Sequence, residues 1–300
     1  MGLYLIEIAL ASFVIALALT PLVRLWALRT GIMDIPNQRS LHCLPVARCG
    51  GIAIYFAFAF PVIYVMGSDP RLFYLFLGAS VVFLTGLIDD IKGLSPLAKL
   101  GGQGLAAAIL IAGGVKIGFL PEAISIPLTV LWLLGVTNAL NLLDGMDGLA
   151  AGVSAIAALF FIILLFGKMD MSVLPAASAL AGACLGFLLF NFHPARIFMG
   201  DTGSMFLGFV LGSLGVMNTF KSSAPLQLFV PVIILGVPIF DTSLAILRRL
   251  WRRKPLFEAD CDHFYEWLWK NRLLGYRNIV IITYFVGLVL GFAALFIGGM

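Results

Sequence analysis

The sequence predicts an all-α polytopic integral membrane protein with about ten transmembrane helices in a single domain over residues 1–300. Of the 300 residues, 61% are hydrophobic and only 11% are charged. A soluble globular chain is about 45–50% apolar and about 25% charged. Apolar runs that approach the length of a bilayer crossing recur along the whole chain. These features exclude a large soluble domain and a disordered chain.

Ten apolar runs follow one another along the chain. The first contains Glu7 and lacks both a basic start and a small-residue cleavage site, so we interpret it as a membrane helix and not as a removed signal peptide. Several runs are shorter than about 20 residues, which indicates tilted, broken or extended helices. The expected spans are 3–23, 50–66, 71–88, 99–113, 123–140, 149–166, 173–190, 204–218, 226–245 and 278–298.

Basic residues predict the orientation of these spans. If the N-terminus is outside, all but four of the 19 Lys and Arg residues fall in the inner loops, and only Arg71, Lys116, Lys168 and Lys221 fall outside. Such a bias marks the cytoplasmic side. It accounts for the net charge of +4. The sequence has no basic stripe with interleaved aromatics, so nucleic-acid binding is not predicted. Both termini are therefore expected outside, and the polar motifs face the cytoplasm.

Asp89 and Asp90 end the third expected span. Two adjacent carboxylates repel each other, and the negative end of a helix dipole is an unfavourable place for them. A bound cation would remove both problems. The alternative is an acidic pair solvated at the membrane surface, but ionisable groups at membrane depth are usually functional.

Residues 138–150 form a dense Asn/Asp/Gly segment between two apolar runs. Asn141, Asp144 and Asp147 recur every three residues, a spacing that a helical turn would place on one face. Gly145 and Gly148 would let the backbone approach a ligand closely. A polar turn in which an aspartate caps the next helix is the alternative interpretation.

Residues 191–204 precede another expected span. Asp201 lies near the start of that span, where a carboxylate can hold Mg²⁺ against phosphate oxygens. Taken alone, Phe198 is interpreted as a packing residue and His193 as a capping or packing residue.

Two inner loops carry further polar candidates. The first loop contains Arg48 before a glycine pair, and its bases suit phosphate or simply set the topology. The last, over residues 247–277, combines bases, tryptophans and His263, either as a membrane-surface anchor or as a basic cover for an anionic substrate. Carboxylates beside bases on one face suit Mg²⁺ and a diphosphate. A carrier would more often bury isolated carboxylates in mid-span.

The sequence resembles the polyprenyl-phosphate N-acetylhexosamine-1-phosphate transferases, glycosyltransferase family 4. The resemblance runs over residues 34–266 and is carried by Leu-Ile-Asp-Asp, Asn-Leu-Leu-Asp-Gly-Met-Asp-Gly-Leu-Ala and Pro-Ala-Arg-Ile-Phe-Met-Gly-Asp-Thr-Gly-Ser, together with Arg-Cys-Gly-Gly. It implies a multi-pass enzyme of the bacterial inner membrane. Such an enzyme moves a sugar-1-phosphate from a UDP-sugar to undecaprenyl phosphate and releases UMP. Mg²⁺ is the implied cofactor, with Mn²⁺ as a substitute, and a homodimer is an implied assembly.

The resemblance also implies roles for single residues. Asp89, Asp90 and His263 would be catalytic, and Asp201 with Asp90 would hold the metal. The implied substrate-binding residues, which include a uridine-binding segment and a ring that stacks on uracil, are Arg48, Lys99, Asn141, Asp144, Asp147, Asn191 and Phe198. Phe198 is the residue whose ring would stack on uracil, and this implied role replaces the packing interpretation given above.

One departure from the family pattern favours a branch. The last inner loop usually holds a histidine-rich motif, whereas this chain keeps only His263, and Tyr265 and Glu266 stand where further histidines are expected. This favours the enzymes that initiate O-antigen or teichoic polymers over the phospho-MurNAc-pentapeptide transferases of peptidoglycan synthesis, which stay an alternative. A transporter without turnover is the alternative from another class. The expected sugar is GlcNAc or a related N-acetylhexosamine.

Overall fold

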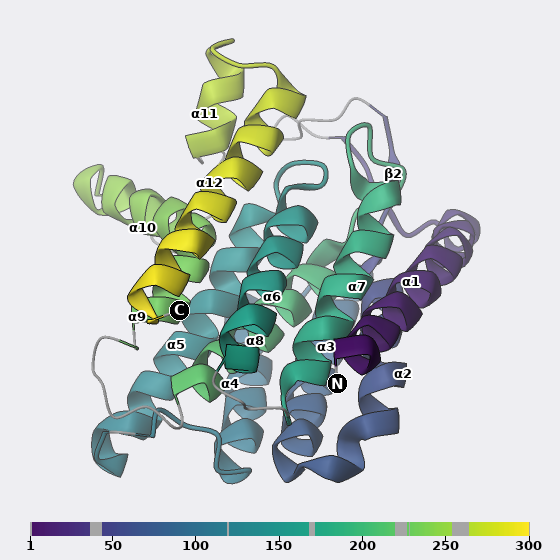
Figure 1. Cartoon of the computed structure of the whole chain (residues 1–300). Coiled ribbons are helices and arrows are strands. Elements are labelled where there is room, and N and C mark those ends of the chain that lie inside the picture. The colour runs from purple at the N-terminus through teal and green to yellow at the C-terminus, as the bar shows by residue number, and fades with distance from the viewer. Residues whose placement is uncertain are drawn as a thin grey trace.

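The computed structural model describes residues 2–36, 44–118, 120–167, 172–219, 227, 229–253 and 264–299, and in these ranges the chain is an α-helical bundle (Figure 1). A short 3-10 helix, Met66–Ser68, lies between two of the α-helices. The helices are α1 Gly2–Thr30, α2 Gly51–Val65, α3 Pro70–Lys92, α4 Pro96–Ala112, α5 Glu122–Leu143, α6 Leu149–Gly167, α7 Leu174–Asn191, α8 Gly200–Thr219, α9 Phe229–Ile234, α10 Gly236–Trp251, α11 Phe264–Lys270 and α12 Tyr276–Ile297.

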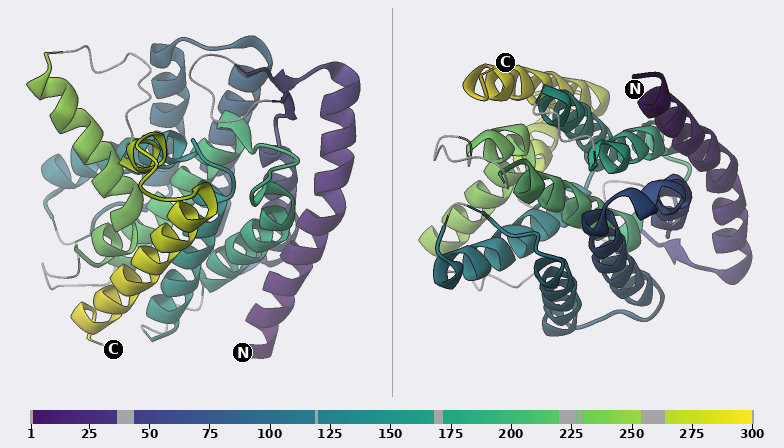
Figure 2. Two further views of the ribbon diagram at one scale, coloured as in Figure 1. Left: turned by 90° about the horizontal axis from the view of Figure 1, so that it is seen from above. Right: turned by 60° about the horizontal axis from the view of Figure 1, so that its bottom comes forward.

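Six of these helices, α1, α3, α5, α6, α7 and α12, are long and apolar enough to cross a membrane, and α2 and α4 are shorter apolar helices. The prediction of an all-α, multi-pass membrane protein is thus confirmed, while the number of ten spans stays a prediction. Figure 2 shows α1 and α12 at the outside of the bundle. They are also the least buried of the six, at 17% and 28% of their apolar windows, as expected for helices that face lipid.

The expected ninth span, 226–245, is not one continuous helix in the described residues. Helix α9 ends at Ile234, and α10 begins at Gly236 after Leu235. Pro238 has no backbone N–H to donate to the carbonyl of Ile234, so the sequence favours a break at this point. Beyond the break, α10 carries bases in its last turn, Arg248 and Arg249.

Helix α8 lies at the centre of the bundle. It contacts α2, α3, α5 and α6, and its side chains are buried almost all round. Glycines permit the close packing, because a Cβ on Gly51 would lie 2.1 Å from the Gly203 nitrogen and one on Gly86 would lie 2.4 Å from the Asp201 carbonyl oxygen. The first turn of α8, which carries Asp201, is therefore held against α2 and α3.

A small antiparallel hairpin, β1 Met33–Asp34 and β2 Val46–Ala47, follows α1. Ala47 also forms a parallel bridge with Ile197, which ties the hairpin to the loop before α8. Figure 1 shows β2 and α11 towards one end of the molecule, and both termini lie away from that end. This hairpin was not predicted from the sequence, because two-residue strands produce no visible alternation.

Candidate active site

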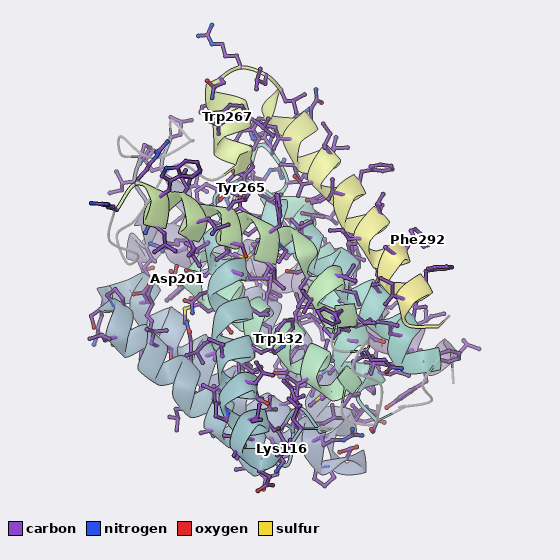
Figure 3. The ribbon with its side chains drawn as sticks, turned by 90° about the vertical axis from the view of Figure 1, so that its left-hand side faces the viewer. Lys116, Trp132, Asp201, Tyr265, Trp267 and Phe292 are labelled. Atoms are coloured by element: carbon purple, nitrogen blue, oxygen red, sulfur yellow. The ribbon has the colours of Figure 1, made fainter. Side chains whose placement is uncertain are left out.

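Three carboxylates from two helices meet beside the N-terminus of α8. Asp89 and Asp90 lie in the last turn of α3, and Asp201 lies in the first turn of α8. One oxygen atom of each carboxylate lies within 4.8 Å of those of the other two. Figure 3 shows Asp201 nearer to the end of the bundle that carries Tyr265 and Trp267 than to the end that carries Lys116. We call Asp89, Asp90 and Asp201 the acidic cluster.

Asp90 is the buried member of the acidic cluster, and protein donors surround its carboxylate. Its Oδ1 accepts from the Asp201 backbone N–H at 3.0 Å and pairs with Arg48 Nε at 2.9 Å. Its Oδ2 accepts from the backbone N–H of Thr202 at 3.0 Å and from the hydroxyl of the same residue. The carboxylate therefore caps the positive end of α8, where free amides favour an anion.

Gly200 makes this cap possible. Its φ of +69° lies in the left-handed region, and a Cβ at this position would lie 2.3 Å from Asp90 Oδ2. Any other residue would be strained and would push the Asp90 carboxylate away from the helix end.

Asp89 and Asp201 share a lysine. Lys99 Nζ lies 3.2 Å from Asp89 Oδ2 and 2.7 Å from Asp201 Oδ2. The other oxygen of Asp89 accepts from the Leu94 backbone N–H at 2.6 Å. Lys99 stands in the first turn of α4, whose N-terminus is capped by the Ser95 side chain. The start of α4 thus delivers a cation between two carboxylates.

Arg48 supplies the second cation from the segment between β2 and α2. Its Nη2 lies 3.5 Å from Asp201 Oδ1, in addition to its contact with Asp90. Burial alone would lower the pKa of the Arg48 guanidinium, but the neighbouring Asp90 and Asp201 carboxylates raise it above its ordinary value. Two fixed cations therefore compensate three carboxylates only in part.

The acidic cluster fits a divalent cation. Its oxygen donors are those that Mg²⁺ prefers, and Mg²⁺ is usually held by one or two carboxylates together with substrate phosphates. Asp90 accepts from two backbone amides and a hydroxyl as well as from Arg48, whereas the Asp201 oxygens contact the side chains of Lys99 and Arg48, and Asp89 Oδ2 contacts Lys99. A metal ion can displace such side chains more easily than backbone amides, so Asp201 and Asp89 are better placed than Asp90 to hold the ion.

Asn141 and Asp144 lie beside the acidic cluster. Asn141 Nδ2 donates to Ser204 Oγ at 2.9 Å, and that hydroxyl donates to the Gly200 carbonyl at 3.0 Å. Asp144 caps the C-terminus of α5. Burial, and then the carboxylates of Asp201 and Asp90, raise the pKa of Asp144 well above its ordinary value. Asp144 is therefore electrostatically part of the site.

Asp147 points to a different set of partners. Its Oδ2 lies 2.8 Å from His193 Nδ1 and accepts from the Ala195 N–H at 3.0 Å. Because α5 ends at Leu143, the three residues predicted to share one helical face do not do so. Asp147 instead links the α5–α6 turn to the loop between α7 and α8. His193, which was expected to be a capping or packing residue, contacts the Asp147 carboxylate and so forms part of this link.

Asn191 makes a second link between the same two segments. Its Oδ1 accepts from the Gly148 N–H at 3.1 Å, and its Nδ2 donates to the Ile197 carbonyl at 2.9 Å. Phe198 follows, with its N–H bonded to the Ala47 carbonyl and its own carbonyl bonded to the Gly50 N–H, both at 2.8 Å. The backbone that carries Phe198 is therefore fixed, and its side chain is half-buried.

The structure thus brings Asp89, Asp90, Asp201, Arg48 and Lys99 into direct contact and places Asn141 and Asp144 beside them. Asp147 and Asn191 fix the adjoining loop. His263 lies outside the described residues. Thr202 was not predicted as a donor to Asp90, although its position directly after Asp201 at a helix start was a visible signal.

An apolar cavity of about 200 Å³ lies elsewhere, at the ends of α5, α8 and α9. The described residues that line it include no acid or base, so they offer nothing to the chemistry of the acidic cluster. Trp132, labelled in Figure 3, is one of its walls. The other lining residues are Ile117, Leu128, Gly215, Val216, Phe229, Pro231 and Val232.

Comparison with known proteins identifies the family. The chain is 35% identical to the probable undecaprenyl-phosphate N-acetylglucosaminyl 1-phosphate transferase of Bacillus subtilis (strain 168), across 95% of this chain and 83% of the relative. It is 34% identical to the decaprenyl-phosphate N-acetylglucosaminephosphotransferase of Mycolicibacterium smegmatis, across 94% and 79%. A phospho-N-acetylmuramoyl-pentapeptide-transferase of Moorella thermoacetica is 37% identical across a smaller share, 69% and 72%. Residues 72–219 match the model of glycosyl transferase family 4. This range includes Asp89, Asp90 and Asp201. The chain therefore belongs to glycosyl transferase family 4, as its motifs led us to expect.

Proposed function

We propose that this protein transfers an N-acetylhexosamine-1-phosphate, with GlcNAc as the first candidate sugar, from a UDP-sugar to undecaprenyl phosphate. The products are the lipid diphosphate sugar and UMP, and the step initiates a cell-surface glycan. The observation that carries the proposal is the acidic cluster with its two cations, in a chain that resembles N-acetylglucosaminyl-1-phosphate transferases over nearly its whole length.

The proposed setting is the bacterial inner membrane, with ten spans, both termini outside and the site at the cytoplasmic face. The distribution of the Lys and Arg residues supports this orientation. A second support is that both termini lie away from the end that carries β2 and α11 (Figure 1), as an even number of crossings requires. A homodimer remains a prediction.

The proposed reaction joins two phosphates and releases a third. An oxygen of the lipid phosphate attacks the β-phosphorus of the UDP-sugar. The bond between that phosphorus and the oxygen shared with the α-phosphate breaks, and UMP leaves with the electron pair. The lipid phosphate is largely dianionic near neutral pH, since its second pKa is about 6. Positioning is therefore more important than a strong general base.

The residues of the site divide this work. Arg48 and Lys99 place positive charge where the diphosphate must bind, and Asp89 helps to orient the lipid phosphate by holding Lys99 in place. Mg²⁺, held by Asp201 and Asp89, would neutralise charge on the diphosphate. A two-step route through a phospho-sugar aspartate is the second mechanism.

The test of this function is UMP release by detergent-purified protein given undecaprenyl phosphate and Mg²⁺. The donors are UDP-GlcNAc, UDP-GalNAc, UDP-QuiNAc, UDP-FucNAc and UDP-MurNAc-pentapeptide. We expect UMP with UDP-GlcNAc, dependent on both lipid and metal. Release with the pentapeptide donor alone would identify the peptidoglycan alternative, and folded protein that releases no UMP would favour the transporter.

Phe198→Ala is expected to raise the KM for the UDP-sugar about tenfold while kcat changes less than threefold. Stacking of a base on an aromatic ring contributes about 1–3 kcal/mol, and the backbone of Phe198 is fixed on both sides. Phe198→Tyr keeps a ring and is the control. An unchanged KM in the alanine variant would show that the ring does not bind the uracil.

A further inference from the structure

Three tyrosines from the C-terminal part of the chain converge on one short backbone segment, residues 142–148. The Tyr265 hydroxyl donates to the Leu142 carbonyl at 2.9 Å. The Tyr276 hydroxyl accepts from the Asp147 N–H at 2.6 Å, and the Tyr284 hydroxyl donates to the Gly148 carbonyl at 2.6 Å. We call Tyr265, Tyr276 and Tyr284 the tyrosine clamp.

The segment has few hydrogen bonds of its own. It begins where α5 ends, and the last carbonyls of a helix have no partner inside that helix. Within the turn, the backbone bonds are from Asp144 to Asn141 at 3.3 Å and from Leu149 to Met146 at 3.0 Å. A tyrosine hydroxyl can serve either a carbonyl or an N–H. The clamp therefore supplies partners for the Leu142 carbonyl and the Asp147 N–H, and it adds a second donor to the Gly148 carbonyl, which also accepts from the Gly152 N–H at 2.9 Å.

Small residues make room for the clamp. A Cβ on Gly145 would lie 2.5 Å from the Tyr265 hydroxyl, and one on Gly152 would lie 2.1 Å from the Tyr284 ring. Tyr265 is itself buried, with 5% of its surface exposed. It stands where the family resemblance led us to expect a histidine, and in this chain it supports the backbone of the turn.

Tyr276 also reaches the second half of the site. Its ring stacks on His193, with centroids 4.3 Å apart and planes at 28°. His193 in turn contacts the Asp147 carboxylate at 2.8 Å. One tyrosine therefore fixes the turn that carries Asp144 and Asp147 against the loop that leads to Phe198.

We propose that the tyrosine clamp is a positioning device for UDP-sugar binding, through which α11 and α12 set the geometry of the α5–α6 turn. The proposal rests on the function proposed above. Asn141 and Asp144 lie at this turn beside the acidic cluster, and Phe198 lies on the loop tied to it. Loosening the turn therefore weakens nucleotide binding more than it slows the chemical step.

The experiment compares Tyr265→Phe, Tyr276→Phe and Tyr284→Phe, singly and together. Each change removes one hydroxyl and keeps the ring. The matched control is Tyr55→Phe, which removes a tyrosine hydroxyl bonded to Ser80 Oγ at 2.8 Å between α2 and α3. The readouts are kcat, the KM for UDP-GlcNAc, the KM for undecaprenyl phosphate, and UMP affinity by calorimetry.

We expect each clamp variant to raise the KM for UDP-GlcNAc and the Kd for UMP about fivefold, the effect of losing one well-placed hydrogen bond. The KM for the lipid and kcat should stay within twofold, and the control should match the wild type. The positioning role would be overturned by clamp variants that match the control. It would also be overturned by clamp variants in which kcat falls and both KM values rise together. A wild type that neither releases nor binds UMP would overturn the proposed function itself, and the clamp proposal with it.

Discussion

Asp201→Asn is expected to lower kcat at least about a thousandfold. The amide keeps the size of the side chain but removes the negative charge that Lys99 and Arg48 contact at 2.7 and 3.5 Å. It also removes one of the carboxylate oxygens that the acidic cluster offers to a divalent cation. Loss of a single electrostatic contributor at a phosphoryl-transfer site commonly costs about a hundred- to a thousandfold, and loss of a metal ligand adds to this.

The measurements are UMP release over a Mg²⁺ titration and, independently of turnover, Mn²⁺ binding followed by electron paramagnetic resonance. Mn²⁺ affinity should fall at least tenfold in the variant. Asp69→Asn is the control, because it removes a carboxylate paired with Arg71 at 2.8 Å at the start of α3, far along the helix from the acidic cluster. Normal turnover and normal Mn²⁺ binding by Asp201→Asn would exclude Asp201 as the metal ligand.

Much of the arrangement was predictable because it is local in the sequence. Apolar length predicts the membrane helices, and the acidic motifs sit at helix ends where α3 stops and α8 starts. The helix ends themselves make the meeting of Asp89, Asp90 and Asp201 a reasonable expectation. Family membership, too, followed from short motifs that the comparisons confirm.

Contacts between distant segments were not predictable in the same way. Tyr265, Tyr276 and Tyr284 are 123, 129 and 136 residues away from the groups they bond, and nothing in their local sequence marks those partners. The break before Gly236 could have been anticipated from Pro238, but an apolar run alone indicates a continuous helix.

The different roles of Asp89 and Asp90 are also invisible in the sequence. Adjacent helical residues point about 100° apart, so one of two neighbouring aspartates can be buried while the other stays accessible. Here the Asp90 side chain is 0% exposed and the Asp89 side chain is 11% exposed. Chain topology places the start of α8 over Asp90, and this makes Asp90 the buried aspartate and Asp89 the accessible one.

Asp90→Asn is therefore expected to act mainly on stability, and Asp89→Asn mainly on turnover. An asparagine at position 90 would turn an NH₂ group towards donors that now bond a carboxylate, and it would remove the negative charge that Arg48 contacts at 2.9 Å. Breaking a buried ion pair costs about 3–5 kcal/mol. We expect a clearly lower midpoint of thermal unfolding in detergent, and loss of activity as a consequence of the displaced α8 terminus.

Asparagine at position 89 can still accept the Leu94 N–H through its carbonyl oxygen. The free energy of unfolding should change by less than about 1 kcal/mol, in the range of a single hydrogen bond. Turnover should nevertheless fall about a hundredfold or more, because the charge that holds Lys99 in place and helps to hold the metal is lost. Thermal unfolding and UMP release measured on both variants test the division. If Asp90→Asn unfolds like the wild type while Asp89→Asn turns over normally, the assignment is reversed, because the aspartate that contributes to chemistry would then be the one that α8 covers.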